Sequence, residues 1–248
     1  MRVPTAALVL TVLLATAAPS TAQARRWNLG YVAAGALAQP AAPPLSDHFT
    51  FDANVETATA DVVYPSKAGI GAGGEAALRM WKRLGVGVAV SYVADTGSAS
   101  IAASIPHPFV FGQPRSISGE EEAVNRAETA AHVQLLYFVP ARGRLRVTVS
   151  AGPTLVSLQQ DIVTAVHYAE AYPYDTALYT RASTTRATGS GLGFNAGADV
   201  QWMLTRRAGV GALVRFTRAR VDIDAAAART VAVTAGGAQV GGGLRVWF

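Results

Sequence analysis

The stretch Gln239-Val-Gly-Gly-Gly-Leu-Arg-Val-Trp-Phe248 decides how the chain is interpreted. With the two-residue period of a β-strand, one face carries glycine and apolar side chains: Val240, Leu244, Val246 and Phe248. The other face carries an amide, a guanidinium, an indole and glycines. Such a strand suits a wall between hydrocarbon and a polar interior, and a final Phe suits the aromatic girdle at the membrane interface. The stretch therefore predicts the closing strand of a membrane β-barrel, with Phe248 as its assembly signal.

Residues 1–24 have the features of a secretory signal peptide. Met1-Arg2 is a positive start, residues 3–18 are apolar apart from Thr and Pro, and small residues follow. This order predicts cleavage after Ala22 or Ala24 and export of the remaining chain. A membrane anchor is the alternative, but the apolar run is short for a transmembrane helix and no stop-transfer pattern follows.

The composition fits an exported β-protein. The chain has 24 Gly and no Cys in 248 residues, with a formal net charge of +5. The absence of Cys excludes a disulfide scaffold. Although the balance is basic, the Arg residues are scattered through strands and turns and form no basic run, so nucleic acid is not expected as a partner.

Residues 49–248 are predicted to form the barrel, and residues 25–48 an N-terminal extension on the periplasmic side. The extension contains the breaker Gln39-Pro-Ala-Ala-Pro-Pro44, although its first part could also be a barrel strand. After it come eight strand-like segments, at about 49–64, 69–81, 85–95, 125–139, 144–158, 190–204, 208–222 and 237–248. The fold class is therefore all-β, an eight-stranded antiparallel up-and-down transmembrane β-barrel.

The connections between these segments alternate in length. Those at 81–85, 140–144 and 205–209 are tight, whereas those at 96–124, 159–189 and 223–236 are long. Short turns on one side and long loops on the other are typical of outer-membrane barrels. With the last strand ending in the periplasm, all three tight turns fall there and all three long loops fall outside the cell.

The chemistry of the polar face separates a membrane barrel from a soluble β-sandwich. In segment 190–204 the apolar positions alternate with Gly193, Asn195, Gly197, Asp199 and Gln201. This face is rich in Gly, Ser and Thr and poor in Lys and Glu, as expected for a narrow interior and unlike a solvated exterior. Eight strands leave an interior that side chains can fill.

Charged and titratable residues recur on the polar faces and are expected to form a charge network in the lumen. They are Glu75, Arg79, Glu128, His132, Asp199, Arg215 and Arg245. Turn arithmetic across 205–209 predicts that Asp199 faces Arg215, with Glu56 or Glu75 as a further inward carboxylate. The expected role is structural, as a salt-bridged core; an ion or proton path gated by these pairs is the alternative.

The sequence offers little support for a catalytic, cofactor or metal site. Glu128 and His132 share a face but lie about 13 Å apart along a strand, too far for an acid to orient a base. Ser150 is expected near Gln134 rather than His132. Gly-x-Ser-x-Gly and His-Glu-x-x-His are both absent. We therefore expect no enzyme activity, no cofactor and no metal, although a triad assembled across strands is not excluded.

The connections 96–124 and 159–189 are the candidate sites for an extracellular ligand. The first contains Ile105-Pro-His-Pro-Phe-Val-Phe111, in which His107 could contact a ligand or serve as a packing or capping residue. The second contains His167 and four Tyr residues, which suit contacts with carbohydrate or protein. The alternative for the second is that it extends the strands and packs its aromatic rings above the membrane.

Residues 49–248 resemble the small outer-membrane β-barrel superfamily that includes the OmpA transmembrane domain and OmpX. Three stretches carry the resemblance, each with inward Gly and one inward charge among apolar outward positions: Gly193–Asp199, Gly209–Arg215 and Gly241–Phe248. It implies contact with outer-membrane lipid and lipopolysaccharide, and insertion by the outer-membrane assembly machinery through the last strand. It also implies a structural anchor, an adhesin or a narrow passive channel, and in most members no enzyme. A peptidoglycan tether is not expected, because no such domain follows the barrel.

The function that we expect is a structural or surface-interaction role with a side-chain-filled lumen, in the bacterial outer membrane. A narrow passive solute channel is the alternative, and a barrel hydrolase is less favoured.

Overall fold

The computed structural model describes residues 29–225 and 229–248. The predicted signal peptide at residues 1–24 lies outside these ranges. Within them, no helix is long and apolar enough to cross a membrane. The chain forms ten strands: β1 (Gly30–Gln39), β2 (Leu45–Ala53), β3 (Glu56–Tyr64), β4 (Gly69–Trp81), β5 (Leu84–Pro106), β6 (Pro114–Val139), β7 (Leu145–Glu170), β8 (Ala177–Met203), β9 (Ala208–Ala225) and β10 (Arg229–Trp247).

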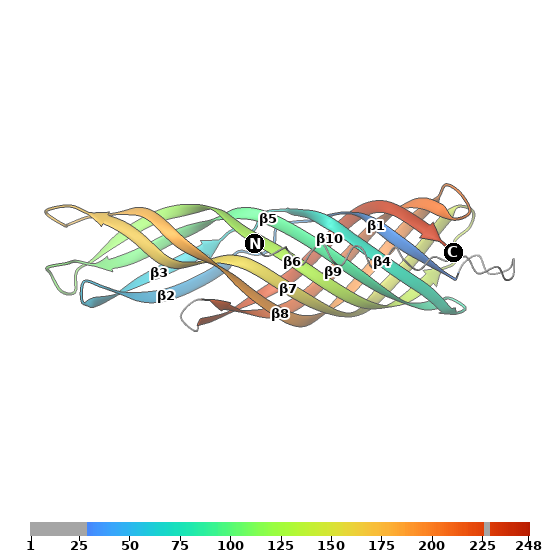
Figure 1. Cartoon of the computed structure of the whole chain (residues 1–248), viewed down its shortest axis with the longest axis horizontal. Coiled ribbons are helices and arrows are strands. Elements are labelled where there is room, and N and C mark those ends of the chain that lie inside the picture. Colours follow the sequence, from blue (N-terminus) through green and yellow to red (C-terminus); the bar gives the residue numbers. More distant parts are fainter. Residues whose placement is uncertain (1–28, 226–228) are drawn as a thin grey trace, which may run out of the picture.

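Eight of these strands close into an antiparallel ring (Figure 1). Strands β4 to β10 pair in chain order, and β1 closes the ring by pairing with β10 on one edge and β4 on the other. Along the closing seam Tyr31 faces Trp247 and Ala38 faces Val240. The prediction of an all-β, eight-stranded, up-and-down barrel is confirmed.

The structure moves the predicted start of the barrel. Residues 30–39, assigned by sequence to an extension, are the barrel strand β1, so the predicted extension at 25–48 was wrong in this part. The segment 49–64 is not a ring strand; it belongs to the β2–β3 hairpin, which turns at Asn54-Val55 and pairs through β3 with the distal part of β5. The physical reason is the proline-rich breaker at residues 40–44. The breaker lies between strand β1 and the hairpin, so the first barrel strand precedes the breaker instead of following it.

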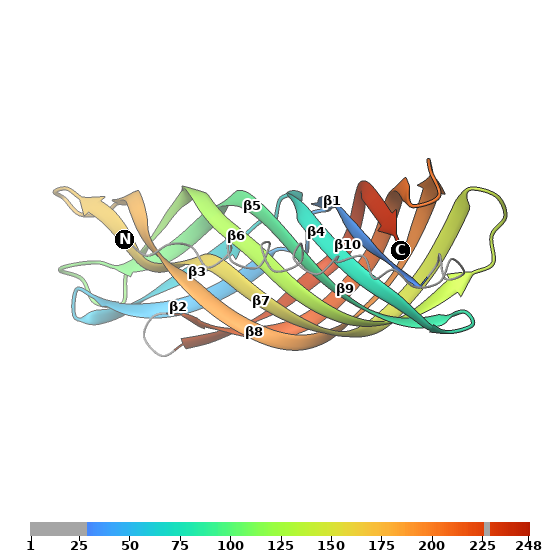
Figure 2. The same cartoon turned by 45° about the vertical axis from the view of Figure 1, so that its right-hand side comes forward.

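The two ends of the barrel differ as expected, but the long connections are mostly strand. We call the end that carries Leu29, Phe248 and the short connections after β4, β6 and β8 the turn end, and the opposite end the loop end. Strands β5 to β8 are 23–27 residues long and run far towards the loop end (Figure 2). Most of 96–124, 159–189 and 223–236 therefore continues the strands, and the second of these confirms the strand-extension alternative.

The outer wall carries an apolar band around the turn-end half of the barrel. Its members point outward and are exposed: Val86, Val88, Tyr92, Val133, Leu135, Val149, Leu155, Leu192, Phe194, Val200, Trp202, Val210, Val214, Phe216, Val240, Leu244 and Val246. Exposed apolar side chains in this number have no place on a water-facing surface, but they are the lipid-facing surface of a transmembrane barrel.

Towards the loop end the polarity of the wall inverts. On β9 the outward residues change from Val214 and Phe216 to Arg218 and Arg220. Over the same part of the strand the inward residues change from polar to apolar, and Ala219, Val221 and Ile223 join a buried core. The core extends through the loop-end half and includes Phe49, Val62, Tyr64, Ile101, Ile105, Leu158, Ile162 and Val233. At the turn end the wall is thus apolar outside and polar inside, whereas at the loop end it is polar outside and apolar inside.

This division predicts opposite responses to charge on one strand. Val200→Arg places a guanidinium in the apolar band of β8 and is expected to lower the free energy of unfolding by about 2–4 kcal/mol near the membrane midplane. Thr188→Arg, on the outer face of the same strand above the band, is expected to change it by less than about 0.5 kcal/mol. Both are measured by denaturant unfolding in lipid vesicles. Equal costs for the two variants would contradict the position of the band.

Candidate functional site in the lumen

An aromatic cluster closes the lumen at the turn end. Trp247 is buried, and its ring centroid lies 4.9 Å from that of Tyr31 and 5.9 Å from that of Phe138. The indole Nε1 donates a 2.7 Å hydrogen bond to Oε1 of Gln201. Arginine guanidiniums lie over these rings, Arg146 at 4.1 Å from the Trp247 centroid and Arg79 at 4.4 Å from the Phe138 centroid. Arg79 is thus on the inward face as predicted, but its described contact is with an aromatic ring and not with a carboxylate.

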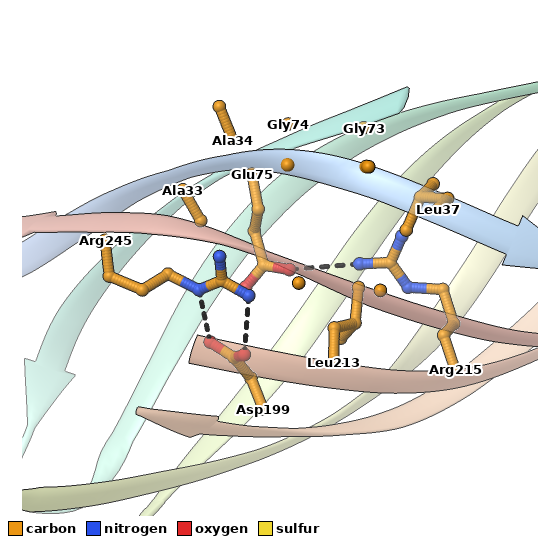
Figure 3. Close-up of a pocket in the computed structure, with 14 residues that line it drawn as sticks. Ala33, Ala34, Leu37, Gly73, Gly74, Glu75, Asp199, Leu213, Arg215 and Arg245 are labelled. Carbon is orange, nitrogen blue, oxygen red and sulfur yellow. Dashed lines mark hydrogen bonds and ion pairs between the residues drawn. The ribbon is translucent and has the colours of Figure 1, made fainter. Parts of the chain in front are cut away.

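The first ion pair lies directly behind this cluster. Arg245 donates two hydrogen bonds to Asp199, from Nη2 to Oδ1 at 2.8 Å and from Nε to Oδ2 at 3.0 Å (Figure 3). Gln201 Nε2 donates a further 2.7 Å hydrogen bond to Oδ2. The bidentate geometry fits the planar guanidinium to the carboxylate, and both side chains are buried.

A second ion pair crosses the lumen beside the first. Arg215 Nη2 donates to Oε2 of Glu75 at 3.0 Å, and the hydroxyl of Tyr31 donates to Oε1 of the same carboxylate. These groups come from β9, β4 and β1, which meet only because the ring is closed. This section of the lumen therefore holds two guanidiniums and two carboxylates in alternation, as Figure 3 shows.

The predicted pairing of Asp199 with Arg215 was wrong. Both point inward, but Asp199 faces Leu213 and Gly197 faces Arg215, because the β8–β9 connection is centred one residue earlier than expected. A two-residue change of register keeps every side chain on its face and exchanges its neighbours. The expected role of Glu75 as the additional inward carboxylate is confirmed by its ion pair, whereas Glu56 accepts a hydrogen bond from the Gly112 amide at the loop end.

His132 belongs to a neutral hydrogen-bonded layer rather than to the charge network. Its Nδ1 lies 2.8 Å from Thr154 Oγ1 and its Nε2 lies 3.1 Å from Ser91 Oγ. In the same layer Gln134 donates to Ser150 at 3.2 Å, as the sequence predicted. Ser91 and His132 are the residue types of a nucleophile and its base, but they are 2% and 1% exposed, and Thr154 takes the place of an orienting acid.

Glu128 forms a third ion pair in the lumen, with Arg126. Arg126 Nε donates to its Oε1 at 3.0 Å, and its Oε2 accepts from the Gly236 amide at 2.9 Å and from Gln39 at 3.4 Å. Sequence analysis included Glu128 but missed Arg126, although a two-residue period places both on one face. It also missed Tyr31 and Gln39, because both lie in the range assigned to the extension.

The space left between the ion pairs is small. A cavity of about 30 Å³ lies among Glu75, Asp199, Arg215, Arg245 and the small residues of β1, β4 and β10. This volume holds a water molecule or two. Glycines in the wall give room to the long side chains; a Cβ added to Gly211 would lie 3.0 Å from Nε of Arg245. The geometry of the lumen is that of a filled core.

No group of three or more His, Asp or Glu residues is placed to hold a metal ion within residues 29–225 and 229–248. The lumen groups Glu75, Glu128, His132 and Asp199 instead contact guanidiniums, amides and hydroxyls. The arrangement can hold the wall together and block the passage of solutes.

The loop end carries the two connections that were predicted to contact a ligand. Arg115 joins them: its guanidinium pairs with Glu170 and donates to the carbonyl oxygens of Pro106 at 2.7 Å and Tyr174 at 2.9 Å. His107 Nδ1 accepts hydrogen bonds from the amides of Phe109 and Val110, both at 3.1 Å, which makes it a capping residue. The loops are thus held together by buried polar contacts.

A set of apolar side chains stands fully exposed on these loops and on the β2–β3 turn. We call this set the tip; its members are Val55 at 96% exposure, Phe109 at 74%, Phe111 at 77% and Tyr172 at 88%. The β2–β3 turn reaches the neighbouring loop through Asn54, whose Nδ2 donates to the Pro106 carbonyl at 3.0 Å. Val55 also has a positive φ of 70°, a conformation that β-branched residues rarely adopt.

Tyr179 anchors the base of the loop region. Its hydroxyl donates to Oε2 of Glu121 at 3.0 Å, and its ring covers Gly119, where an added Cβ would lie 2.0 Å from a ring carbon. Burial, together with the hydrogen bond to Glu121 and the charge of that carboxylate, raises the pKa of Tyr179 from its usual 10.0 to about 12.

This pKa predicts a loss of stability at high pH. Because the folded-state pKa is raised, the contribution is fully present below pH 10 and is lost as the pH rises through about 12. Tyr179→Phe is expected to flatten the fall in melting temperature over this window. Tyr172→Phe, which changes an exposed tyrosine, is expected to keep the wild-type slope. An unchanged slope in Tyr179→Phe would show that this hydroxyl is not the titrating group.

Comparisons with known proteins found similar solved structures but no related sequence. No protein-family model and no curated protein sequence matches the chain. Among solved structures it is similar to the outer membrane protein OprG from Pseudomonas aeruginosa, with 10% identity, coverage of 90% of this chain and 97% of that one, and a TM-score of 0.47. It is also similar to Neisserial surface protein A, with 14% identity, coverage of 88% and 97%, and a TM-score of 0.46.

A third similar structure is Ail, the attachment invasion locus protein of Yersinia pestis, solved with the heparin analogue sucrose octasulfate. It shares 10% identity over 88% of this chain and 99% of that one, with a TM-score of 0.39. At these scores the likeness says nothing about function. The closed ring, apolar band and filled polar lumen of the chain define its class, which is the eight-stranded transmembrane β-barrel.

Proposed function

We propose that this protein is a surface-interaction barrel of the bacterial outer membrane, with a lumen that does not conduct. The apolar band spans the membrane, the turn end faces the periplasm and the loop end faces the outside. Short periplasmic turns and longer external connections are the usual orientation of such barrels. The charge network of the lumen holds the wall closed, and the tip makes contacts beyond the membrane.

The inversion of wall polarity is the observation that carries this proposal. Loops that only cover a pore would not need a continuous apolar core above the apolar band. Here strands β5 to β10 continue past the band and enclose the core of Ile101, Ile162, Val221 and their neighbours. Such a core makes the loop end a packed stalk that holds the tip at a fixed distance from the membrane.

The tip has the chemistry of a contact surface. Exposed aromatic side chains lose little conformational entropy on binding and bury a large apolar area, so they are frequent hot spots of protein interfaces. The Phe109 ring meets the Tyr174 ring edge-on at a centroid distance of 5.3 Å, which fixes part of the surface in advance. We propose that the extracellular ligand expected at 96–124 and 159–189 binds here.

Cell adhesion tests the role of the tip. Bacteria that display the wild-type protein are expected to bind at least one member of a panel of immobilised glycans and matrix proteins. The triple variant Phe109→Ser, Phe111→Ser and Tyr172→Ser is expected to lose at least about tenfold of that binding, since hot-spot truncations cost about 2 kcal/mol or more. Leu178→Ser, which changes an exposed apolar residue of β8 outside the tip, is the matched control. Equal adhesion of the triple variant and the wild type would contradict the proposal.

Planar-bilayer recording tests the channel alternative. The two ion pairs and the aromatic cluster cross the lumen, with a cavity of about 30 Å³ beside the ion pairs, so we expect no conductance steps from the refolded protein. Regular steps would favour a narrow channel. Labelling by a serine-directed inhibitor, absent from Ser91→Ala, would favour the hydrolase.

The role of Phe248 in assembly is also a proposal. Its amide donates to the Gly30 carbonyl at 3.1 Å and its carbonyl accepts from the Leu29 amide at 3.0 Å, so it belongs to the closing seam. Deletion of Phe248 is expected to lower the yield of membrane-inserted protein while leaving export intact, because the assembly machinery would recognise the shortened last strand less well. A normal yield with unchanged heat-modifiable gel migration would contradict it.

A further inference from the structure

Two arginines stand on the outer wall at the loop-end edge of the apolar band. Phe216, Arg218 and Arg220 occupy successive outward positions of β9, and all three are exposed. Phe194 of β8 lies directly beside Arg218, and its ring centroid is 6.2 Å from that of Phe216. Cationic groups therefore follow immediately on an exposed aromatic pair.

Neighbouring strands change differently at the edge of the band. On β8 the outward positions after Leu192 are Ser190 and Thr188, and on β10 Gly236 and Thr234 lie beside Arg218 and Arg220. These strands pass from apolar to small or neutral residues, whereas β9 passes directly to two guanidiniums. The next exposed cation of β8, Arg186, is paired with Asp161, so an unpaired pair of cations at the edge of the band is specific to β9.

Neither guanidinium has a partner among the described residues. Arg218 and Arg220 make no hydrogen bond or ion pair there, and the nearest outward carboxylate of β9, Asp222, lies beyond Arg220 and not between the two arginines. Two cations two residues apart on one strand face repel each other. An anion between them would remove the repulsion. At the edge of the hydrocarbon, a long side chain keeps its stem on apolar surface and its charge among lipid headgroups.

We propose that Arg218 and Arg220 bind the phosphate of a phosphorylated, multiply acylated glycolipid of the outer leaflet, the chemistry of the lipid A part of lipopolysaccharide. The phosphate lies between the guanidiniums, and the acyl chains lie against Phe216, Phe194 and Leu192 below them. The site rests on the proposed orientation, in which the loop-end edge of the band meets the outer leaflet.

Lipid binding to the full-length barrel in phosphatidylcholine nanodiscs tests the site. Diphosphorylated lipid A is titrated into the nanodiscs, and its retention per barrel is measured by native mass spectrometry. The double variant Arg218→Gln and Arg220→Gln is expected to bind about 30-fold more weakly than the wild type. The matched control Arg181→Gln and Arg206→Gln makes the same charge change elsewhere on the exposed surface and is expected to keep wild-type affinity.

Further arms identify the source of the phosphate. Dephosphorylated lipid A is expected to bind the wild type as weakly as the double variant binds lipid A, and inorganic phosphate is expected not to compete. Equal affinity of the double variant, an equal loss in the control, or effective competition by inorganic phosphate would overturn the proposal. A barrel that inserts and shows no preference for lipid A refutes this site alone, whereas one that does not insert refutes the proposed membrane location.

Discussion

Replacement of Asp199 by alanine is expected to lower the free energy of unfolding by about 3–5 kcal/mol. Asp199 is 4% exposed, and its carboxylate accepts two hydrogen bonds from the Arg245 guanidinium, together with one from Gln201. Without it, Arg245 remains in the lumen with its positive charge unpaired. The measurement is urea unfolding in lipid vesicles, compared with the wild type.

A double variant separates the free energy lost with the ion pair from the cost of leaving the buried Arg245 charge without a counterion. Asp199→Ala with Arg245→Met removes both charges and fills part of the space, so it is expected to recover most of the stability. Asp222→Ala, which removes an exposed carboxylate from the outer face of β9, is expected to cost less than about 0.5 kcal/mol. A loss of about 1 kcal/mol or less in Asp199→Ala would mean that water enters the lumen and screens the arginine, and would contradict a closed core.

The second guanidinium makes this result informative about function. Arg215 stays paired with Glu75 in the single variant, so the lumen keeps one ion pair across its section. If Asp199→Ala is only mildly destabilised and also conducts in a planar bilayer, the pair is the gate of a channel. Strong destabilisation without conductance supports the proposed structural role.

The sequence was sufficient for the fold because period-two alternation is strong in the last strands. Val210, Val214 and Phe216 alternate with Gly211, Leu213 and Arg215, and the structure gives each the side of the wall that the alternation predicts. Strand β1 was missed for the opposite reason. Its outward residues are Val32 and three alanines, and its inward ones include Ala33 and Gly35, so the two faces differ little in hydrophobicity.

The lengths of the strands could not be predicted from the search for apolar outward residues. On β7 the apolar residues beyond residue 158, such as Ile162 and Val166, lie on the inward face, and we interpreted residues 159–189 as a loop. A test for a change of phase in the alternation, rather than for its end, would have found the distal parts of β7 and β8.

Which side chains pair within the lumen depends on two properties that cannot be derived from the alternation of polar and apolar residues. One is register: a turn centred one residue earlier moves Arg215 from Asp199 to Gly197. The other is closure, since Glu75 and Arg215 lie 140 residues apart and meet across the barrel. Sequence analysis therefore found most of the charged side chains and which face they occupy, but not which of them pair.

Replacement of Trp247 by alanine is expected to be as costly as the loss of Asp199, about 3–5 kcal/mol. The indole is 2% exposed and fills the turn end of the lumen between Tyr31, Phe138 and the Arg146 guanidinium. Its removal leaves a cavity among groups fixed to three different strands, which cannot collapse to fill it. The removal also deprives Oε1 of Gln201, a fully buried side chain, of its hydrogen-bond donor.

Trp202 provides a matched control for this substitution. It is a tryptophan on β8 near the same turn end, but its side chain points outward and is 53% exposed in the apolar band. Trp202→Ala removes the same number of atoms without opening the lumen, and is expected to cost about 2 kcal/mol, from lost contact with lipid, in the same unfolding assay. If Trp202→Ala proved the more damaging of the two, anchoring in the lipid interface would outweigh packing in the lumen. The aromatic cluster would then not be the closure of the turn end that its burial and contacts imply.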